Sequence, residues 1–342
     1  MKLNKKHPLY QEDINNILSV KDIETLRNKR ILITGSTGMV GVMLIDALMS
    51  LGGVTVYAVG RNREKAKARL GEYFDCDNFI FIEQDVCQPF DESITVDYII
   101  PAASNTHPLA YSKYPVETIF VNIKGAENAL SLASRCGACV LYPSSTEIYG
   151  NAVDNKPFIE DSNGMLNLGN ARACYNESKR SAEAMCQSYL SEYGVDVKIA
   201  RLCRIFGPTM LEGDTKASSQ FIKKSLAGED IVLKSSGMQY FSYTYVADAV
   251  MGLFEILLHG ETGKAYNISS EKTNVHLRDF ADICAKINGK KVVFDIPSET
   301  EQRGYSIAMN SILDNDRIRR IGFKPKYEIE DAIRRTIKIL GD

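Results

Sequence analysis

Residues 34–41 read Thr34-Gly35-Ser36-Thr37-Gly38-Met39-Val40-Gly41, and this stretch decides the fold. It follows the apolar run 31–34, typical of a short buried strand, and opens the segment 39–51, whose apolar residues have helical spacing. The three glycines let the turn tighten and the backbone approach a pyrophosphate, whose charge then meets the helix N-terminus. The stretch predicts a dinucleotide-binding loop; a tight turn without a ligand is the alternative.

Strands and helices alternate from residue 30 onward. Apolar runs typical of strands lie at 31–34, 54–59, 79–84, 97–101, 139–143 and 197–202. Segments with helical spacing separate them, at 39–51, 61–70, 116–134 and 178–193. This order predicts an α/β protein with a Rossmann-type, doubly wound parallel sheet that helices cover on both faces.

The pattern also suggests a division into domains. Residues 1–29 are polar and weakly helical, and we expect an N-terminal helical arm. Residues 30–207 form the predicted dinucleotide-binding domain, to which 236–260 return as a strand end and a helix. Residues 208–235 and 261–342 mix short helices and strands, which favours a smaller C-terminal α/β subdomain that binds the substrate.

Composition narrows the class of protein. The 342 residues include 44% apolar residues and carry a net charge of −2, which gives no reason to expect nucleic acid or a membrane as partner. No apolar run approaches the roughly 20 residues of a membrane span, and the N-terminus lacks the apolar stretch of a signal peptide. We therefore expect a cytoplasmic protein. The eight cysteines and four histidines are scattered along the sequence, so we expect no metal site.

The ends of the predicted strands supply the expected cofactor contacts. After the second strand comes Arg61 and no acid; an acid would favour NAD, whereas an Arg favours the 2′-phosphate of NADP. Asp85, after the third strand, is placed to contact the adenine edge. The full set of expected contacts is Gly35, Thr37, Gly38, Met39, Val40, Gly41, Arg61, Asp85, Val86, Ala102, Ala103 and Lys179.

Tyr175 and Lys179 are four residues apart and therefore lie on one face of a predicted helix. An ammonium beside a phenol lowers the phenol's pKa, so Tyr175 can take a proton from a hydroxyl while hydride leaves the carbon. About 30 residues upstream, the strand 140–143 ends in Ser144-Ser145-Thr146-Glu147, at the sheet edge where open α/β folds bind ligands. This combination indicates hydride-transfer chemistry.

These motifs resemble those of the extended short-chain dehydrogenases/reductases of the NAD-dependent sugar epimerase/dehydratase group. The resemblance covers about residues 30–340, and within the group the UDP-glucuronate decarboxylases are most similar. It is carried by Arg172-Ala173-Cys174-Tyr175-Asn176-Glu177-Ser178-Lys179-Arg180, Ser144-Ser145-Thr146-Glu147-Ile148-Tyr149-Gly150, Phe206-Gly207-Pro208 and Tyr245-Val246-x-Asp248.

The resemblance implies a cofactor, NAD or alternatively NADP, that stays bound and is regenerated on a nucleotide sugar. It makes Tyr175 the base, Lys179 the group that lowers its pKa and holds the nicotinamide ribose, and Ser145 a hydrogen-bond donor to the reacting oxygen. Ser144 stands beside it, and Glu147 assists chemistry beyond C4. Substrate contacts are expected from Asn105, His107, Thr146, Arg204, Lys216 and Gln220. A homodimer through helices near 116–134 and 178–193 is also implied.

The substrate side departs from the family pattern. Thr146 replaces the Asp that donates a proton in related dehydratases, and a hydroxyl is a far poorer acid near pH 7. Phe241 stands where the family has an Arg for the diphosphate, and Arg204 where it has a substrate-contacting Asn. A second family Arg aligns near Asn310, with Arg303 the nearest basic residue. Compensation could come from Arg204, Lys216, Lys223 or Lys234, unless these lysines are solvated surface.

Several functions fit the sequence. The first is a nucleotide-sugar epimerase or decarboxylase that forms a 4-keto intermediate, with a 4,6-dehydratase less favoured because of Thr146. An NADP-linked carbonyl reductase, suggested by Arg61, is a second. The third is a non-catalytic dinucleotide-binding regulator, although such proteins typically lose the Tyr or the Lys, which this chain keeps.

Overall fold

The computed structural model of the chain describes residues 2–106, 108–151, 156–295 and 310–341. Its largest element is a seven-stranded sheet in the order β10-β6-β5-β4-β1-β2-β3, in which every pairing is parallel. The strands are β1 (Arg30–Thr34), β2 (Thr55–Gly60), β3 (Phe79–Glu83), β4 (Tyr98–Pro101), β5 (Cys139–Ser145), β6 (Val197–Leu202) and β10 (Ala265–Ile268). The predicted Rossmann-type sheet is confirmed.

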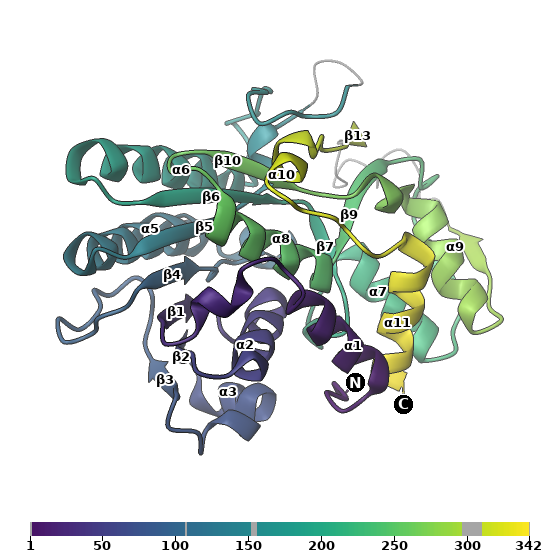
Figure 1. Cartoon of the computed structure of the whole chain (residues 1–342). Helices are drawn as coiled ribbons and strands as arrows, with labels where there is room; N and C mark the ends of the chain where they lie inside the picture. The colour runs from purple at the N-terminus through teal and green to yellow at the C-terminus, as the bar shows by residue number, and fades with distance from the viewer. Residues whose placement is uncertain (1, 107, 152–155, 296–309, 342) are drawn as a thin grey trace.

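Helices cover both faces of this sheet (Figure 1). Ile31 and Ile33 of β1 pack with α2 (Met39–Leu51) and α8 (Val246–His259), whereas Leu32 packs with the cluster of the opposite face. That cluster includes α5 (Pro115–Cys136) and α6 (Ala173–Tyr193). Successive strand residues point to opposite faces, so the apolar run of β1 is buried from both sides.

The smaller elements lie beyond the carboxyl ends of β5 and β6. A four-stranded sheet joins β11 (Asn274–His276), β9 (Tyr240–Tyr245), β13 (Asn310–Ser311) and β7 (Arg204–Phe206), and a two-stranded sheet joins β12 (Val292–Phe294) to β8 (Ile231–Leu233). The other helices are α1 (Pro8–Ile17), α3 (Arg63–Leu70), α4 (Pro108–Lys113), α7 (Ala217–Leu226), α9 (Leu277–Ile287), α10 (Asp316–Arg320) and α11 (Ile329–Gly341). Short 3₁₀ turns occupy Ile23–Leu26, Gly71–Tyr73, Thr146–Tyr149 and Glu271–Thr273.

The chain crosses between the large sheet and the smaller one more often than the predicted boundaries allow. β10 falls within 261–342, which we assigned to the smaller unit, yet it pairs with β6 and extends the main sheet. Conversely, β9 falls in the segment expected to return to the main sheet but pairs with β7 and β11. Each of these strands pairs with a strand that is distant in the sequence, and the residues around a strand do not indicate which distant strand it pairs with. The division into domains otherwise stays a prediction.

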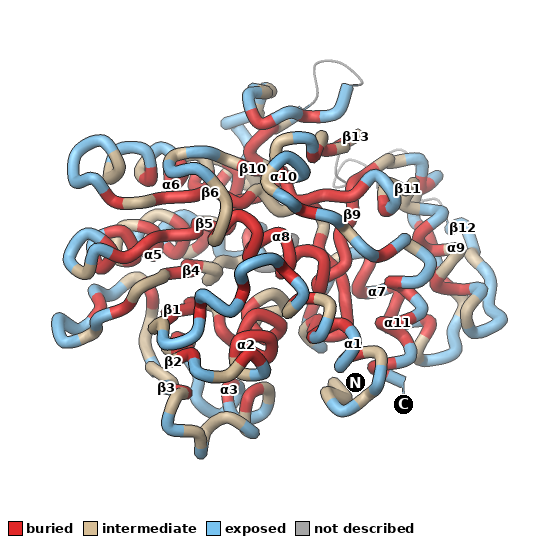
Figure 2. The backbone as a smooth tube through the Cα atoms, viewed as in Figure 1, coloured by how far each residue is buried: buried red, intermediate tan, exposed pale blue. Residues whose placement is uncertain are grey.

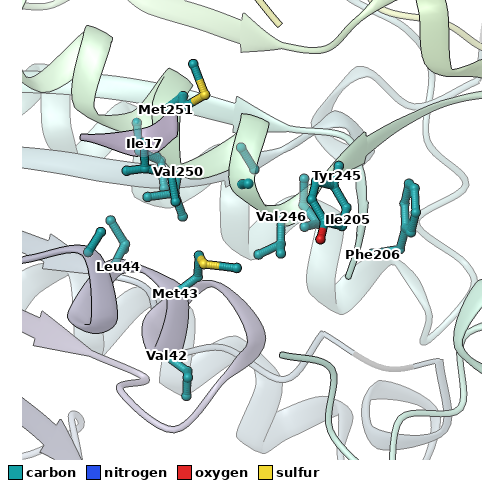
Figure 3. Packing of buried hydrophobic residues seen from close by; sticks show 14 of the residues in the cluster. Ile17, Val42, Met43, Leu44, Ile205, Phe206, Tyr245, Val246, Val250 and Met251 are labelled. Atoms are coloured by element: carbon teal, nitrogen blue, oxygen red, sulfur yellow. The ribbon is translucent and has the colours of Figure 1, made fainter. Parts of the chain in front are cut away.

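The N-terminal segment packs against both parts of the molecule. Figure 3 shows Ile17 of α1 beside Val250 and Met251 of α8, and Figure 1 shows α1 next to α11. Asp46, buried in α2, accepts hydrogen bonds from Lys5, Tyr10 and Tyr73. In the burial view of Figure 2, the red stretches run through the centre of the molecule, in the sheet, α2 and α8.

A second buried carboxylate, Asp13 of α1, ties the arm to the C-terminal helix. It accepts hydrogen bonds from the hydroxyls of Tyr245 (2.5 Å) and Tyr327 (2.8 Å). The guanidinium of Arg335 in α11 donates to it at 2.7 Å. The carboxylate therefore joins α1, β9 and α11 through one set of hydrogen bonds.

We predict that Asp13→Ala lowers the free energy of unfolding by about 3–5 kcal/mol, because it leaves the Arg335 charge and two hydroxyls buried without their partner. Urea denaturation measures this. Glu12→Ala is the matched control: Glu12 also pairs with Arg335, but its side chain is 57% exposed whereas that of Asp13 is 0% exposed. The control should lose less than about 1 kcal/mol; equal losses would contradict the role of Asp13.

Candidate active site

A cleft of about 600 Å³ runs along the carboxyl ends of the main-sheet strands. Its lining includes Gly35 after β1, Arg61 after β2, Asp85 after β3, Ala102 after β4 and Ser145 at the end of β5. The strand order reverses between β1 and β4, and the cleft spans this point. Ligands of open α/β sheets bind at such a switch point.

The glycine loop is folded tightly onto itself at the start of α2. Gly35 has φ +65°, in the left-handed region, and a Cβ there would lie 2.8 Å from the backbone of Ala102. A Cβ on Gly41 would lie 2.4 Å from the carbonyl oxygen of Gly35. The N-cap of α2 is Gly38, which offers no capping side chain, so the first amides of the helix are left for a ligand. These features fit a pyrophosphate.

Tyr175, Ser145 and Lys179 meet in the same cleft. Burial raises the pKa of Tyr175, and a hydrogen bond with Ser145 opposes that effect. Burial also lowers the pKa of Lys179 to about 8. Its ammonium donates to the Pro143 carbonyl at 2.7 Å and lies 4.7 Å from the centroid of the Tyr142 ring. Burial therefore dominates the titration of both groups.

Comparison with known proteins identifies the family. The sequence matches the model of the NAD dependent epimerase/dehydratase family over residues 31–269. It is 33% identical over 322 residues to UDP-glucuronic acid decarboxylase 1 of Xenopus tropicalis, covering 93% of this chain and 73% of that protein. UDP-glucuronic acid decarboxylase 6 of Arabidopsis thaliana is 32% identical, with 90% and 87% covered. The chain belongs to the NAD-dependent epimerase/dehydratase family.

Solved structures agree with this membership in fold. UDP-glucose 4-epimerase from Thermotoga maritima superposes with a TM-score of 0.77 at 21% identity, covering 91% of this chain and 98% of that one. UDP-glucuronic acid 4-epimerase from Bacillus cereus, in complex with UDP-glucuronic acid and NAD, gives 0.75 at 18% identity, with 91% and 98% covered. At these identities the likeness establishes the fold, which is the one predicted.

All twelve residues expected to contact the cofactor of this NAD-dependent family member line the cleft: Gly35, Thr37, Gly38, Met39, Val40, Gly41, Arg61, Asp85, Val86, Ala102, Ala103 and Lys179. The Arg61 guanidinium, which suggested NADP, donates to the Glu117 carboxylate at 3.0 Å. Asp85 accepts from the backbone amide of Cys87 at 2.9 Å. The positive charge beside the second strand is thus already paired with a carboxylate of α5.

Glu147 lies in the 3₁₀ turn that follows the two serines at the end of β5. Its amide donates to Ser145 Oγ at 3.2 Å, and Asn176 of α6 donates to its carbonyl at 2.7 Å. The Ser144 hydroxyl is buried and makes no hydrogen bond in the described part of the chain. Glu147 and both serines line the cleft beside Tyr175.

The expected substrate residues divide into three groups. Asn105, Thr146, Arg204 and Lys216 line the cleft. Gln220 does not, because its exposed side chain turns back to donate to the Asp214 carbonyl at 2.6 Å; that expectation is corrected. His107 lies outside the described residues.

The structure also shows which of the basic residues that could replace the missing family arginines line the cleft. Lys223 and Lys234 are not part of the cleft wall, and Lys223 donates to the Asp214 carbonyl at 2.7 Å. Asn310 belongs to β13 and does not line the cleft, whereas Arg303 lies outside the described residues. Arg204 and Lys216 remain the candidates inside the cleft.

Sequence reasoning missed several wall residues, among them Tyr111, Arg172, Tyr243 and Leu277. The Tyr111 ring lies 5.6 Å from the Tyr175 ring, centroid to centroid. Tyr111 follows the fourth strand by ten residues and lies in the short helix α4, which has too few residues for a periodicity that marks it. Among the described residues, no group of three or more His, Cys, Asp or Glu is placed to hold a metal ion. No described helix is long and apolar enough to cross a membrane.

We predict that Gly41→Ala weakens NAD binding by about tenfold or more, which corresponds to about 1.4 kcal/mol, because the new methyl group collides with the Gly35 carbonyl. Isothermal titration with NAD measures the effect. Gly71→Ala is the control, since a Cβ at Gly71 meets nothing within 4 Å. Unchanged NAD affinity in Gly41→Ala would contradict the assignment of the loop.

Proposed function

We propose that this protein converts a nucleotide sugar through transient oxidation by a tightly bound NAD, as a decarboxylase or an epimerase. The observation that carries the proposal is the meeting of Ser145, Tyr175 and Lys179 in one cleft with the glycine loop. The family membership and the decarboxylase relatives support it.

Each residue has a defined part in the proposed reaction. The glycine loop and Lys179 would hold NAD, which would supply the acceptor for the sugar's hydride and the donor for its return. Tyr175 takes the proton of the sugar hydroxyl, and Ser145 hydrogen-bonds the same oxygen. The Lys179 ammonium has three N–H donors, of which one is used by Pro143, so others remain for the nicotinamide ribose. Glu147 stands beside this group for proton transfer at the neighbouring carbon.

The structure also supplies observations against the alternatives. The Thr146 hydroxyl, which replaces the dehydratase acid, is buried and paired with the Ser311 hydroxyl at 3.2 Å. The Arg61–Glu117 pair offsets the charge that favoured an NADP-linked reductase. Both support a redox-neutral enzyme that uses NAD, and the retained Tyr175 and Lys179 argue against a non-catalytic regulator.

We predict that Tyr175→Phe lowers kcat for the nucleotide-sugar substrate by about 10²–10⁴-fold, because it removes the proton acceptor and leaves the fold intact. NAD content of the purified protein should not change. Tyr193→Phe, an exposed tyrosine at the end of the same helix, is the matched control. A Tyr175→Phe enzyme with wild-type kcat would refute the assignment.

We also propose that the chain forms a homodimer through α5 and α6. An exposed apolar stripe runs along one face of α5: Val116, Ile119, Phe120 and the half-buried Ile123. These residues recur at helical spacing, and small exposed residues, Ser181, Ala184 and Ser188, lie along the neighbouring α6. A contiguous apolar stripe on a paired-helix surface is typical of a protein–protein contact.

Phe120→Glu is therefore predicted to convert a dimer into a monomer, because it places a charge in the apolar interface. Sedimentation equilibrium measures the mass. Phe294→Glu is the matched control: Phe294 of β12 is 52% exposed, as is Phe120, but lies on a different surface. A monomeric wild type, or a dimer in both variants, would contradict the proposed interface.

A further inference from the structure

Arg204 places a guanidinium in the cleft without a hydrogen-bonded partner on Nη1. That nitrogen is buried and makes no hydrogen bond to any described residue. Nη2 lies 3.8 Å from Glu147 Oε1, close enough for an ion pair but beyond hydrogen-bond distance. A buried donor without a partner is costly, and such groups in native proteins are commonly satisfied by a ligand or an ordered water.

Phe241 holds this guanidinium in place. The Arg204 guanidinium carbon lies 3.6 Å from the centroid of the Phe241 ring, a cation–π contact. The backbone sets up this contact: Arg204 of β7 pairs with Tyr243 of β9, and Phe241 is two residues earlier on β9. Stacking fixes the guanidinium plane and leaves the in-plane N–H groups to meet a planar anion.

The other basic side chains of the cleft are engaged differently. Arg61 pairs with Glu117, Lys216 with Asp214 at 3.4 Å, and Lys179 donates to the Pro143 carbonyl. Lys65 of α3 lines the cleft near Arg61, whose charge acts on it. The Arg172 guanidinium lies over the Tyr111 ring. Among the described basic residues of the cleft, Arg204 alone combines a buried unpartnered donor with a place beside Glu147.

Arg204 is also close to the reacting groups. It lies against Glu147, whose amide is bonded to Ser145, the hydroxyl that hydrogen-bonds Tyr175. Burial raises the pKa of Tyr111 to about 12, while Arg172 and Arg204 act to lower it. The Tyr111 ring lies against the Tyr175 ring, with centroids 5.6 Å apart and planes tilted by 32°. An anion bound by Arg204 would therefore lie near the sugar carbon that Tyr175 and Ser145 address.

We propose that Arg204, stacked on Phe241, binds a carboxylate carried by the sugar ring and is the residue that selects a nucleotide-activated uronic acid over a neutral nucleotide sugar. The inference rests on the proposed function and deepens it. A carboxylate offers two oxygens that match the guanidinium fork. The diphosphate of a nucleotide sugar is bonded at C1, opposite C4 in the ring, and we assign it to Lys216, which lines the cleft at the start of α7 and also pairs with Asp214.

Calorimetric binding of UDP-glucuronate and UDP-glucose to the NAD-loaded enzyme tests this. Both ligands share the nucleotide and the diphosphate, and they differ only in the carboxylate. Tyr175→Phe serves as the background so that bound ligand is not turned over. Arg204→Gln is expected to weaken the binding of UDP-glucuronate by about 10- to 100-fold and to change the affinity for UDP-glucose by no more than a factor of about 2. Arg204→Lys keeps the positive charge but lacks the guanidinium fork, so its affinity for UDP-glucuronate should lie between those of the background enzyme and Arg204→Gln.

Lys216→Gln is the matched control and should weaken both ligands alike, because both carry the diphosphate. Melting temperature and NAD content show whether each variant is folded, and the Lys variant keeps the test open if the Gln variant is not. Equal weakening of both ligands by Arg204→Gln would overturn the proposal in favour of diphosphate binding. A background enzyme that binds UDP-glucose as tightly as UDP-glucuronate, or binds neither, would also overturn it. The proposed function is decided separately, by turnover of nucleotide sugars and its loss in Tyr175→Phe.

Discussion

The close approach of the backbone to itself at Gly35 and Gly41 is the constraint on which the rest of the site depends. Side chains at these positions would lie 2.8 Å from Ala102 and 2.4 Å from the Gly35 carbonyl, so only glycine lets β1, β4 and α2 converge. The convergence leaves the first amides of α2 uncapped at the switch point of the sheet. A dinucleotide bound there passes along the strand ends, where Ser145, Tyr175 and Lys179 line the same cleft.

The substrate side is built on a different principle. The glycine loop depends on backbone shape, whereas the part of the cleft that we propose for the substrate is lined by side chains from separate elements: Glu147 after β5, Arg204 in β7 and Phe241 in β9. Phe241 and Arg204 are two departures from the expected family pattern, and they meet in space because the guanidinium lies over the ring. The guanidinium in this part of the cleft is therefore carried by β7, and position 241 of β9 carries the ring beneath it.

Sequence reasoning succeeded where the signal is local. The strand–loop–helix at residues 30–51 and the Tyr175–Lys179 spacing depend on neighbours within a few residues, so the Rossmann sheet and the position of Tyr175 and Lys179 in one cleft could be predicted. It failed where a contact is set by segments that are distant in the sequence. The partner of Arg61 is Glu117, the seventh strand is the four-residue β10, and Gln220 turns to the Asp214 carbonyl instead of the cleft. The stacking of Arg204 on Phe241 likewise depends on the pairing of β7 with β9.

Transient oxidation with return of the same hydride is the central claim, and isotope retention tests it most directly. The enzyme, purified with its NAD and given no added cofactor, is incubated with UDP-glucuronate carrying deuterium at C4, and the product is examined by NMR. Our account predicts conversion with the deuterium kept in the product sugar. Loss of the label from the product, or conversion that occurs only with stoichiometric consumption of added NAD(P)H, would contradict it.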